Sequence, residues 1–210
     1  MFIGLVGKSC SGKNYIGQIL QDKGYEVWDL DELCHQALEE EENVRSVAKA
    51  FGPQVLDGAS ISRKALGRIV FENPAKRAEL ENILYPWLVQ KIRSYDANAR
   101  RDAKPKEKEP VVFLNGALLR RSSLDSYCKF IVYVDAPYKD RMERACSRDG
   151  ITEQAFEKRE AAQKDVDFRE NHYKSPIFVI NNNKETKNLE LIRQINIICD
   201  RIENDIQQGE

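Results

Sequence analysis

The sequence predicts an α/β protein of three layers, in which helices cover both faces of a five-stranded parallel sheet. Two observations predict this class. Five short apolar runs recur at wide intervals along the 210 residues, and segments of helix length separate them. The runs lack a regular alternation of polar and apolar residues, which is typical of strands buried on both faces of a parallel sheet. We therefore expect a doubly wound sheet.

The predicted strands are rich in β-branched and aromatic residues. They are expected at residues 2–6, 25–29, 111–114, 130–134 and 177–180. The first helix should begin near Gly12 and run to about Asp22, because Lys23 and Gly24 are a basic residue followed by a typical C-terminal stop.

The long segment from 31 to 95 contains no convincing strand. Glycine and proline interrupt it at 51–53, 57–60 and 73–74, so several helices are expected there as an insertion after the second strand. Residues 99–110 are highly charged and contain prolines, which favours a solvated connector.

The last segment carries apolar residues three or four positions apart. They are Leu189, Ile192, Ile195, Cys199, Ile202 and Ile206. This spacing predicts an amphipathic helix that packs on the sheet.

Charge and cysteine content argue against several classes of function. The 33 Lys and Arg residues nearly cancel the 34 Asp and Glu residues, so no global field indicates a nucleic-acid or membrane partner. The five cysteines are scattered without C-x-x-C spacing, which indicates neither a disulfide framework nor a zinc site. No apolar run approaches the roughly 20 residues of a membrane span, and no signal peptide is evident. We expect a single cytoplasmic domain with lobes.

A glycine-rich motif, GLVGKSCSGKN, occupies residues 4–14. It follows an apolar strand and opens a helix, which is the arrangement in which backbone N–H groups and a helix N-terminus converge on phosphate oxygens. Gly7 and Gly12 permit close backbone approach, and Lys13 would neutralise phosphate charge. The alternative is a glycine-rich turn of purely structural value. The motif favours ATP binding.

Two carboxylates, Asp29 and Asp31, end the second predicted strand. Ligands of open α/β sheets bind beyond the carboxyl ends of the strands, so both acids should lie near the glycine-rich loop. One could orient Mg²⁺ through water while the other accepts a proton from an acceptor hydroxyl. Alternatively, either acid could cap the following helix.

Arginines gather after the fourth predicted strand. Arg141, Arg144 and Arg148 are three and four residues apart, so one helical face should present several guanidinium groups, which suit the charge of a transferring phosphoryl group. Interspersed glutamates leave open the alternative of a solvated, ion-paired pair of helices.

The chain resembles the dephospho-coenzyme A kinase family over residues 3 to about 183. The most specific segment is RKALGRIVFENPAKRAELENILYPWL, with FGPQVLD before it and VYVDAP, RMERACSRDGI and VINN after it. The resemblance implies a P-loop three-layer α/β/α fold with a helical acceptor-binding insertion and a helical lid. It also implies transfer of the ATP γ-phosphoryl group to the ribose 3′-hydroxyl of dephospho-coenzyme A with Mg²⁺, the last step of coenzyme A synthesis.

The same resemblance implies roles for residues at matching positions. The catalytic residues would be Lys13, Asp31, Asp29 and Arg144. ATP would contact Gly7, Lys8, Ser9, Cys10, Ser11, Gly12, Lys13, Asn14, Tyr15 and Arg148. The acceptor would contact Asp31, Tyr85, Asn115, Leu118, Arg141, Arg159 and Gln163. Asn14 and Asp29 would serve the metal, residues 31–95 would form the acceptor lobe, and residues 137–166 would form the lid.

The chain departs from the usual family pattern near the metal. Asn14 replaces a serine or threonine, and Asn115 replaces an acid. An amide oxygen can ligate Mg²⁺ but carries no charge, so we expect an unusually high Mg²⁺ requirement. Arg120 and Arg121 stand where the family has an apolar residue and an acid, and they either meet acceptor phosphates or face solvent.

Two other functions compete with this reading. The neutral residues Asn14 and Asn115 are also compatible with a nucleotide-binding protein that turns over little or no ATP. A kinase of another small hydroxyl-bearing acceptor is the third candidate, although such kinases normally have a different helical insertion.

Overall fold

The structure is a computed structural model that describes residues 1–102, 110–170 and 172–208. It divides into two compact units, which are described separately. The sheet unit comprises Met1–Asp29 and Ala103–Glu210, and the helical unit comprises Leu30–Asp102. In the described parts of the chain, no helix combines the length and the apolar character needed to span a bilayer.

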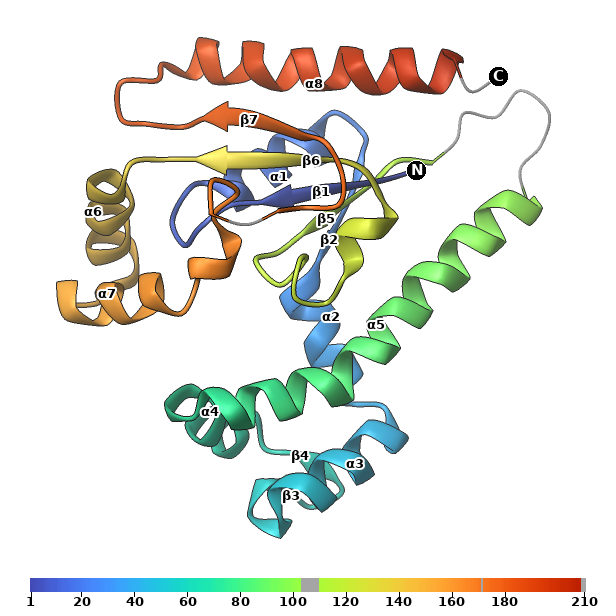
Figure 1. Cartoon of the computed structure of the whole chain (residues 1–210), viewed down its shortest axis with the longest axis vertical. Helices are drawn as coiled ribbons and strands as arrows, with labels where there is room; N and C mark the ends of the chain where they lie inside the picture. The colour runs from blue at the N-terminus through green and yellow to red at the C-terminus, as the bar shows by residue number, and fades with distance from the viewer. Residues whose placement is uncertain (103–109, 171, 209–210) are drawn as a thin grey trace. The chain divides into compact units, whose positions relative to one another are not determined.

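The sheet unit is built on five parallel strands in the order β2-β5-β1-β6-β7. They are β1 (Phe2–Val6), β2 (Glu26–Asp29), β5 (Val112–Asn115), β6 (Cys128–Asp135) and β7 (Ile177–Asn181). This confirms the predicted α/β fold and its five strands. The central strand β1 lies between β5 and β6, so its carboxyl end meets the ends of both neighbours (Figure 1).

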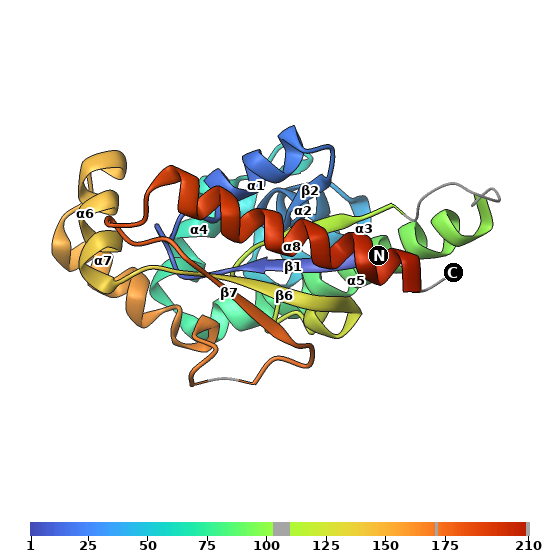
Figure 2. The same ribbon diagram turned by 90° about the horizontal axis from the view of Figure 1, so that it is seen from above.

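One face of the sheet is covered by two helices, α1 (Lys13–Asp22) and α8 (Asn188–Gln208). Ile16 and Leu20 of α1 and Ile195 of α8 are at most 1% exposed in this core, and α8 lies over the strands (Figure 2). Burial of such a side chain contributes about 1.5–3 kcal/mol. The sheet is thereby fixed beneath the loop that joins β1 to α1.

The predicted apolar face of α8 was partly wrong. Leu189 is 81% exposed and Ile192 is 39% exposed, whereas Leu191 and Ile198 are buried. The buried seam follows Leu191, Ile195, Ile198 and Ile202. Apolar residues lie on two nearly opposite sides of this helix. Their spacing alone therefore did not determine which side faces the sheet.

The opposite face of the sheet is packed by the segment between β5 and β6, which includes the short helix η2 (Leu124–Tyr127). A Cβ atom on Gly4 would lie 2.5 Å from Leu119 Cδ2 and 2.6 Å from Ile131 Cδ1. The missing side chain at Gly4 therefore allows Leu119 to pack directly on the central strand.

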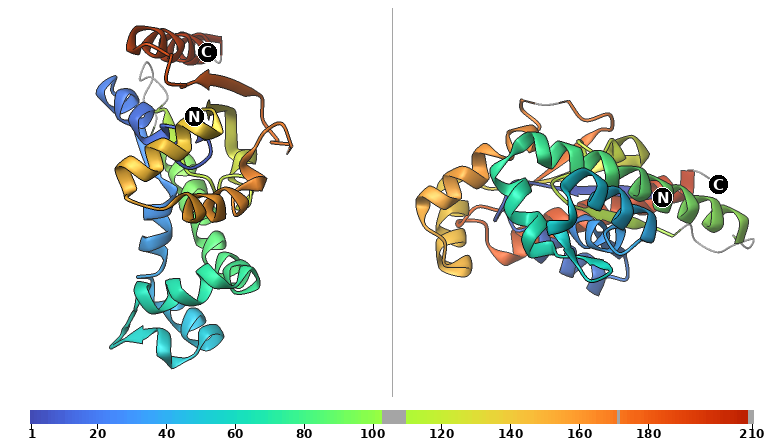
Figure 3. Two further views of the ribbon diagram at one scale, coloured as in Figure 1. Left: turned by 90° about the vertical axis from the view of Figure 1, so that its left-hand side faces the viewer. Right: turned by 90° about the horizontal axis from the view of Figure 1, so that it is seen from below.

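A pair of helices follows β6 at the carboxyl end of the sheet, α6 (Tyr138–Asp149) and α7 (Glu153–Ala161), and the short helix η3 (Lys164–Val166) comes next (Figure 3). Gly150, at φ +64°, ends α6, and Thr152 Oγ1 accepts a hydrogen bond from Ala155 N to cap α7. Phe156 of α7 is fully buried in a small apolar cluster with Ala145 of α6 and Cys10 of the glycine-rich loop.

The helical unit contains four α-helices, a short helix and a small hairpin within its described residues. The elements are α2 (Leu30–Ala37), α3 (Glu41–Phe51), η1 (Pro53–Val55), β3 (Leu56–Asp57), β4 (Ser60–Ile61), α4 (Arg63–Glu72) and α5 (Pro74–Asp102). Asn73 separates α4 from α5, and its Oδ1 caps α5 by accepting hydrogen bonds from Ala75 N and Lys76 N.

Two expectations for this region were wrong. The segment 31–95 does contain strands, because β3 and β4 pair antiparallel around Gly58, whose φ of +62° suits a tight turn. The predicted connector at 99–110 begins as helix, since α5 continues to Asp102. Charged residues continue a helix as readily as they form a loop. The part of that prediction at 103–109 lies outside the described residues.

Candidate active site

The glycine-rich loop joins β1 to α1 and is closely packed against the ends of β6 and β7. A Cβ atom on Gly7 would lie 2.5 Å from the backbone oxygen of Val134 in β6 and 2.6 Å from Ser11 Oγ. Gly12 has φ +103°, and a Cβ atom there would lie 2.1 Å from Asn182 Nδ2. Glycine is therefore required at both positions, by close approach at Gly7 and by backbone conformation at Gly12.

The helix N-terminus at the end of this loop is open to a ligand. Gly12 provides no side-chain cap for α1, and the N-terminus of a helix is a favourable place for an anion. Lys13 Nζ donates hydrogen bonds to the backbone oxygens of Gly7 at 2.6 Å and Lys8 at 3.4 Å, which folds the lysine over the loop. The structure thus brings a cation and a helix N-terminus together at the predicted phosphate site.

Arginines of α6 reach the same loop. Arg144 Nη1 donates to the backbone oxygens of Cys10 and Ser11, each at 3.3 Å, and Nη2 donates to Asn182 O at 2.8 Å. Arg148 Nη2 lies 3.6 Å from Cys10 Sγ. A cavity of about 430 Å³ opens here between the loop and α6, lined by Cys10, Gly12, Glu143, Arg144, Ser147, Arg148 and Lys184. Arginine groups beside a helix N-terminus suit a polyanionic ligand.

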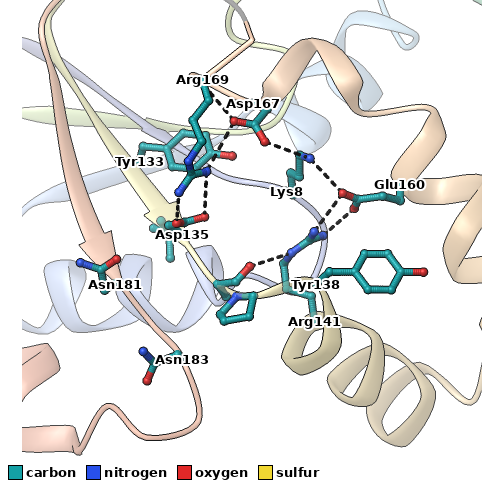
Figure 4. A pocket seen from close by; sticks show the side chains of 13 residues that line it. Lys8, Tyr133, Asp135, Tyr138, Arg141, Glu160, Asp167, Arg169, Asn181 and Asn183 are labelled. Atoms are coloured by element: carbon teal, nitrogen blue, oxygen red, sulfur yellow. Dashed lines mark hydrogen bonds and ion pairs between the residues drawn. The ribbon is translucent and has the colours of Figure 1, made fainter.

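A second cavity, of about 350 Å³, lies where the loop meets the segment after α7 (Figure 4). Lys8 Nζ is 2.9 Å from Glu160 Oε1 and 3.1 Å from Asp167 Oδ2. Burial alone would lower the pKa of the Lys8 ammonium, but these hydrogen bonds outweigh burial and the pKa is raised. Burial would likewise raise the pKa of both acids, yet their hydrogen bonds hold the pKa of Glu160 and of Asp167 below the usual range. All three groups are therefore charged at neutral pH.

The proposed metal neighbourhood contains a pair of amides. Asn115 ends β5 and is 6% exposed, and its Nδ2 donates to Asn14 Oδ1 at 3.1 Å. Asn115 Oδ1 is buried and has no hydrogen-bond partner among the described residues. Asn115 is in register with Asp29 of β2, whose side chain is exposed. Asn115 and Asp29 thus lie at the ends of adjacent strands, and Asn14, in the first turn of α1, contacts Asn115.

The remaining predicted residues fall into two groups. In the sheet unit, Gln163 Oε1 accepts a hydrogen bond from Ser9 N at 2.7 Å, Leu118 is 7% exposed, and Tyr15 is 52% exposed. In the helical unit, Asp31 is an exposed residue in the first turn of α2 and Tyr85 is a half-buried residue of α5. Asp31 lies inside α2 and not at its N-cap, so the capping alternative is wrong for Asp31, although an acid in the first turn still favours the helix.

The predicted arginine face proved to be divided. Arg141 is 4% exposed, and its Nη1 and Nη2 donate to Glu160 at 2.6 and 2.9 Å. Arg148 and Arg159 both bond Asp149, and these hydrogen bonds lower the pKa of Asp149 to about 2. Ion pairing within the two helices therefore coexists with the contacts of Arg144 to the loop.

Arg120 and Arg121 do something that the sequence did not predict. Arg120 Nε donates to the backbone oxygen of Asp165 at 3.0 Å, and Arg121 Nε lies 3.2 Å from Asp165 Oδ2. Both arginines thus attach the loop after β5 to η3.

Sequence reasoning also missed Asn182, Asp167, Asp135 and Arg169. Asn182 Nδ2 donates to Ser11 O at 2.7 Å, and Arg169 forms an ion pair with Asp135. A signal for Asn182 was present, because it follows the last strand directly and residues after parallel strands converge at one edge. Asp167 and Arg169 lie in an irregular segment that offered no such signal.

Several known proteins are similar to this chain. The model of the protein family described as dephospho-CoA kinase matches residues 1–188. A dephospho-CoA kinase of Parasynechococcus marenigrum is 38% identical over 77% of this chain and 78% of its own length. One of Fusobacterium nucleatum is 31% identical over 96% of this chain and 98% of its own length. A Thermus thermophilus protein, described as TT1252, superposes with a TM-score of 0.74 at 27% identity, covering 96% of this chain and 97% of that one.

Proposed function

The chain belongs to the dephospho-CoA kinase family, and from this premise we propose how its own residues support the reaction. It is an ATP-dependent kinase that transfers a phosphoryl group to the ribose 3′-hydroxyl of dephospho-CoA and yields CoA. One observation carries the assignment of the site: an uncapped helix N-terminus, Lys13 and Arg144 converge on the loop between β1 and α1. Such convergence suits the β- and γ-phosphates of ATP.

Backbone N–H groups of residues 7–14 would hold the phosphates, and Lys13 would leave the carbonyl of Gly7 to meet them. Arg144 and Arg148 would contact the nucleotide from α6, across the cavity of about 430 Å³. The contacts of Arg144 to two loop carbonyls are long, at 3.3 Å, so little is lost when a phosphate competes for its donors.

The donor atoms near the loop fit Mg²⁺. Mg²⁺ prefers oxygen ligands and, in kinases, takes most of them from phosphates and water. The described residues contain no group of three His, Cys, Asp or Glu side chains placed to hold a metal ion, and in this proposal the nucleotide supplies most of the ligands. Asn14 Oδ1, the buried Asn115 Oδ1 and the Asp29 carboxylate would complete its surroundings. When bound, the metal would neutralise charge on the transferring phosphoryl group.

The acceptor side is proposed from sequence position. Asp31 would accept the proton of the ribose hydroxyl, with Asp29 in support, and residues 31–95 would form the lobe that receives dephospho-CoA. Tyr85, Leu118, Arg141, Arg159 and Gln163 would serve this substrate. The helices of the lid, residues 137–166, would close over both substrates. We place the enzyme in the cytoplasm.

A panel of acceptors in one coupled assay for ADP tests the proposed function. ADP formation should require dephospho-CoA and should not occur at comparable rate with a nucleoside, a nucleotide or shikimate. Lys13→Ala should abolish turnover, while Lys23→Ala, at the exposed far end of α1, should leave it unchanged. ATP binding without turnover of any acceptor would instead select the non-catalytic alternative that Asn14 and Asn115 raise.

A further inference from the structure

Six charged side chains of alternating sign connect the end of β6 to the lid helices (Figure 4). We call this series the charge chain, and it runs Asp135, Arg169, Asp167, Lys8, Glu160, Arg141. Its successive members are within ion-pair distance, for example 3.5 Å from Arg169 Nη1 to Asp167 Oδ1 and 2.6 Å from Arg141 Nη1 to Glu160 Oε2. Lys8 is its middle cation and its one member from the glycine-rich loop.

The charge chain is mostly buried from Asp167 to Arg141, whereas the side chain of Arg169 is 53% exposed. The side chains of Lys8, Glu160 and Asp167 are 17%, 19% and 14% exposed, and that of Arg141 is 5% exposed. Partly buried charges are poorly screened, so losing one partner is costly, whereas exposed pairs contribute little. The structure has therefore enclosed this contact between loop and lid.

The side chain and the backbone of Lys8 have different partners. Its ammonium group binds the two acids, while its backbone oxygen accepts hydrogen bonds from Ser11 N at 3.1 Å and Lys13 Nζ at 3.4 Å. The neighbouring Ser9 is held as well, since its N–H donates to Gln163 and its oxygen accepts from Arg141. Lys8 and Ser9 are thus attached to the lid through these side chains, and Cys10 and Ser11 contact it through Arg144.

We propose that Lys8 is a positioning residue, which fixes the end of α7 to the loop and so holds Arg144 and Arg148 of the adjoining α6 over the nucleotide. This inference rests on the proposed function of the loop. It assigns to Lys8 a role in which its side chain contacts lid carboxylates in place of phosphate.

The substitution Lys8→Met tests this proposal with little risk to folding. Each acid retains a second cation, since Glu160 keeps Arg141 and Asp167 keeps Arg169. The KM for ATP should rise about tenfold, which corresponds to about 1.4 kcal/mol, while kcat changes less. Lys8→Arg, which preserves the charge, should restore most of the affinity. Lys23→Met, which removes an exposed charge at the far end of α1, should leave KM unchanged.

Hydrogen–deuterium exchange without nucleotide separates this proposal from the kinase assignment. Amides of 153–166 should exchange faster in Lys8→Met than in the wild type, and Lys8→Arg should resemble the wild type. This result would support the attachment even if no acceptor were phosphorylated. Unchanged exchange would overturn the proposal, and so would faster exchange with an unchanged KM for ATP, because the contact would then be structural alone.

Discussion

Replacing Gly12 with alanine probes how closely the phosphate loop is packed. Gly12 has φ +103°, and a residue with a Cβ atom adopts such a conformation at a cost of about 1–3 kcal/mol. The new Cβ atom would lie 2.1 Å from Asn182 Nδ2. The Asn182 amide must therefore move away and lose its 2.7 Å hydrogen bond to Ser11 O, which is worth about 0.5–1.5 kcal/mol. We expect Gly12→Ala to lower the free energy of unfolding by about 2–4 kcal/mol.

Gly24→Ala is a matched control. Gly24 has φ +92°, and a Cβ atom there meets nothing within 4 Å, so this variant should lose only the conformational contribution of about 1–3 kcal/mol. Urea denaturation followed by circular dichroism measures both changes, and their difference of about 1 kcal/mol reports the Asn182 contact.

Calorimetric titration with ATP completes the test. Gly12→Ala should weaken ATP binding about tenfold or more, because displaced loop amides no longer converge on phosphate, whereas Gly24→Ala should bind as the wild type does. Equal losses of stability together with equal ATP affinities would refute the packing argument.

Two further predictions concern the metal and pH. Combining Asn14→Ser with Asn115→Asp restores a hydroxyl and a carboxylate near the metal. The Mg²⁺ concentration that half-saturates ATP binding, measured by calorimetry, should then fall about 3–10-fold. An unchanged Mg²⁺ dependence would show that the two amides serve the metal equally well. The charge chain should stabilise the protein fully between about pH 4.5 and pH 10.5, the ordinary pKa values of Glu160 and Lys8. Folding lowers the pKa of Glu160 and raises the pKa of Lys8. The stabilisation is therefore lost as the pH falls through the lowered pKa of Glu160, or as the pH rises through the raised pKa of Lys8. The difference in melting temperature between wild type and Lys8→Met should therefore be constant from pH 5 to pH 9 and shrink in acid, and a difference that persists in strong acid would argue against the ion pairs.

The central strands β5, β1 and β6 could be predicted from the sequence because burial on both faces demands uninterrupted apolar residues, and the partly buried edge strands β2 and β7 also carry apolar runs. The runs at 2–6 and 177–180 correspond closely to β1 and β7, while β6 extends from Cys128 to Asp135 around the predicted 130–134. Helix orientation was harder to predict, as Leu189 and Leu191 show, because both are apolar and only the position of the neighbouring sheet decides between them.

The position of the glycine-rich loop between β1 and α1 was predicted correctly, because the motif consists of consecutive residues. Gly7, Gly12 and Lys13 occupy a motif that a single segment reveals. The charge chain could not be predicted in this way, because Lys8 and Asp167 meet only after the sheet and the lid have formed. In the sequence they are two common charged residues among many.

The small apolar cluster of Cys10, Ala145 and Phe156 bears on the order in which contacts form while the polypeptide is being synthesised. Cys10 leaves the ribosome early, whereas Phe156 follows long after it, so their contact closes a very long loop of chain. A nascent or truncated chain that ends before α7 carries the entire glycine-rich motif but lacks the packing that seats it. The contacts of Cys10 with Ala145 and Phe156 can therefore form only after α6 and α7 have been made.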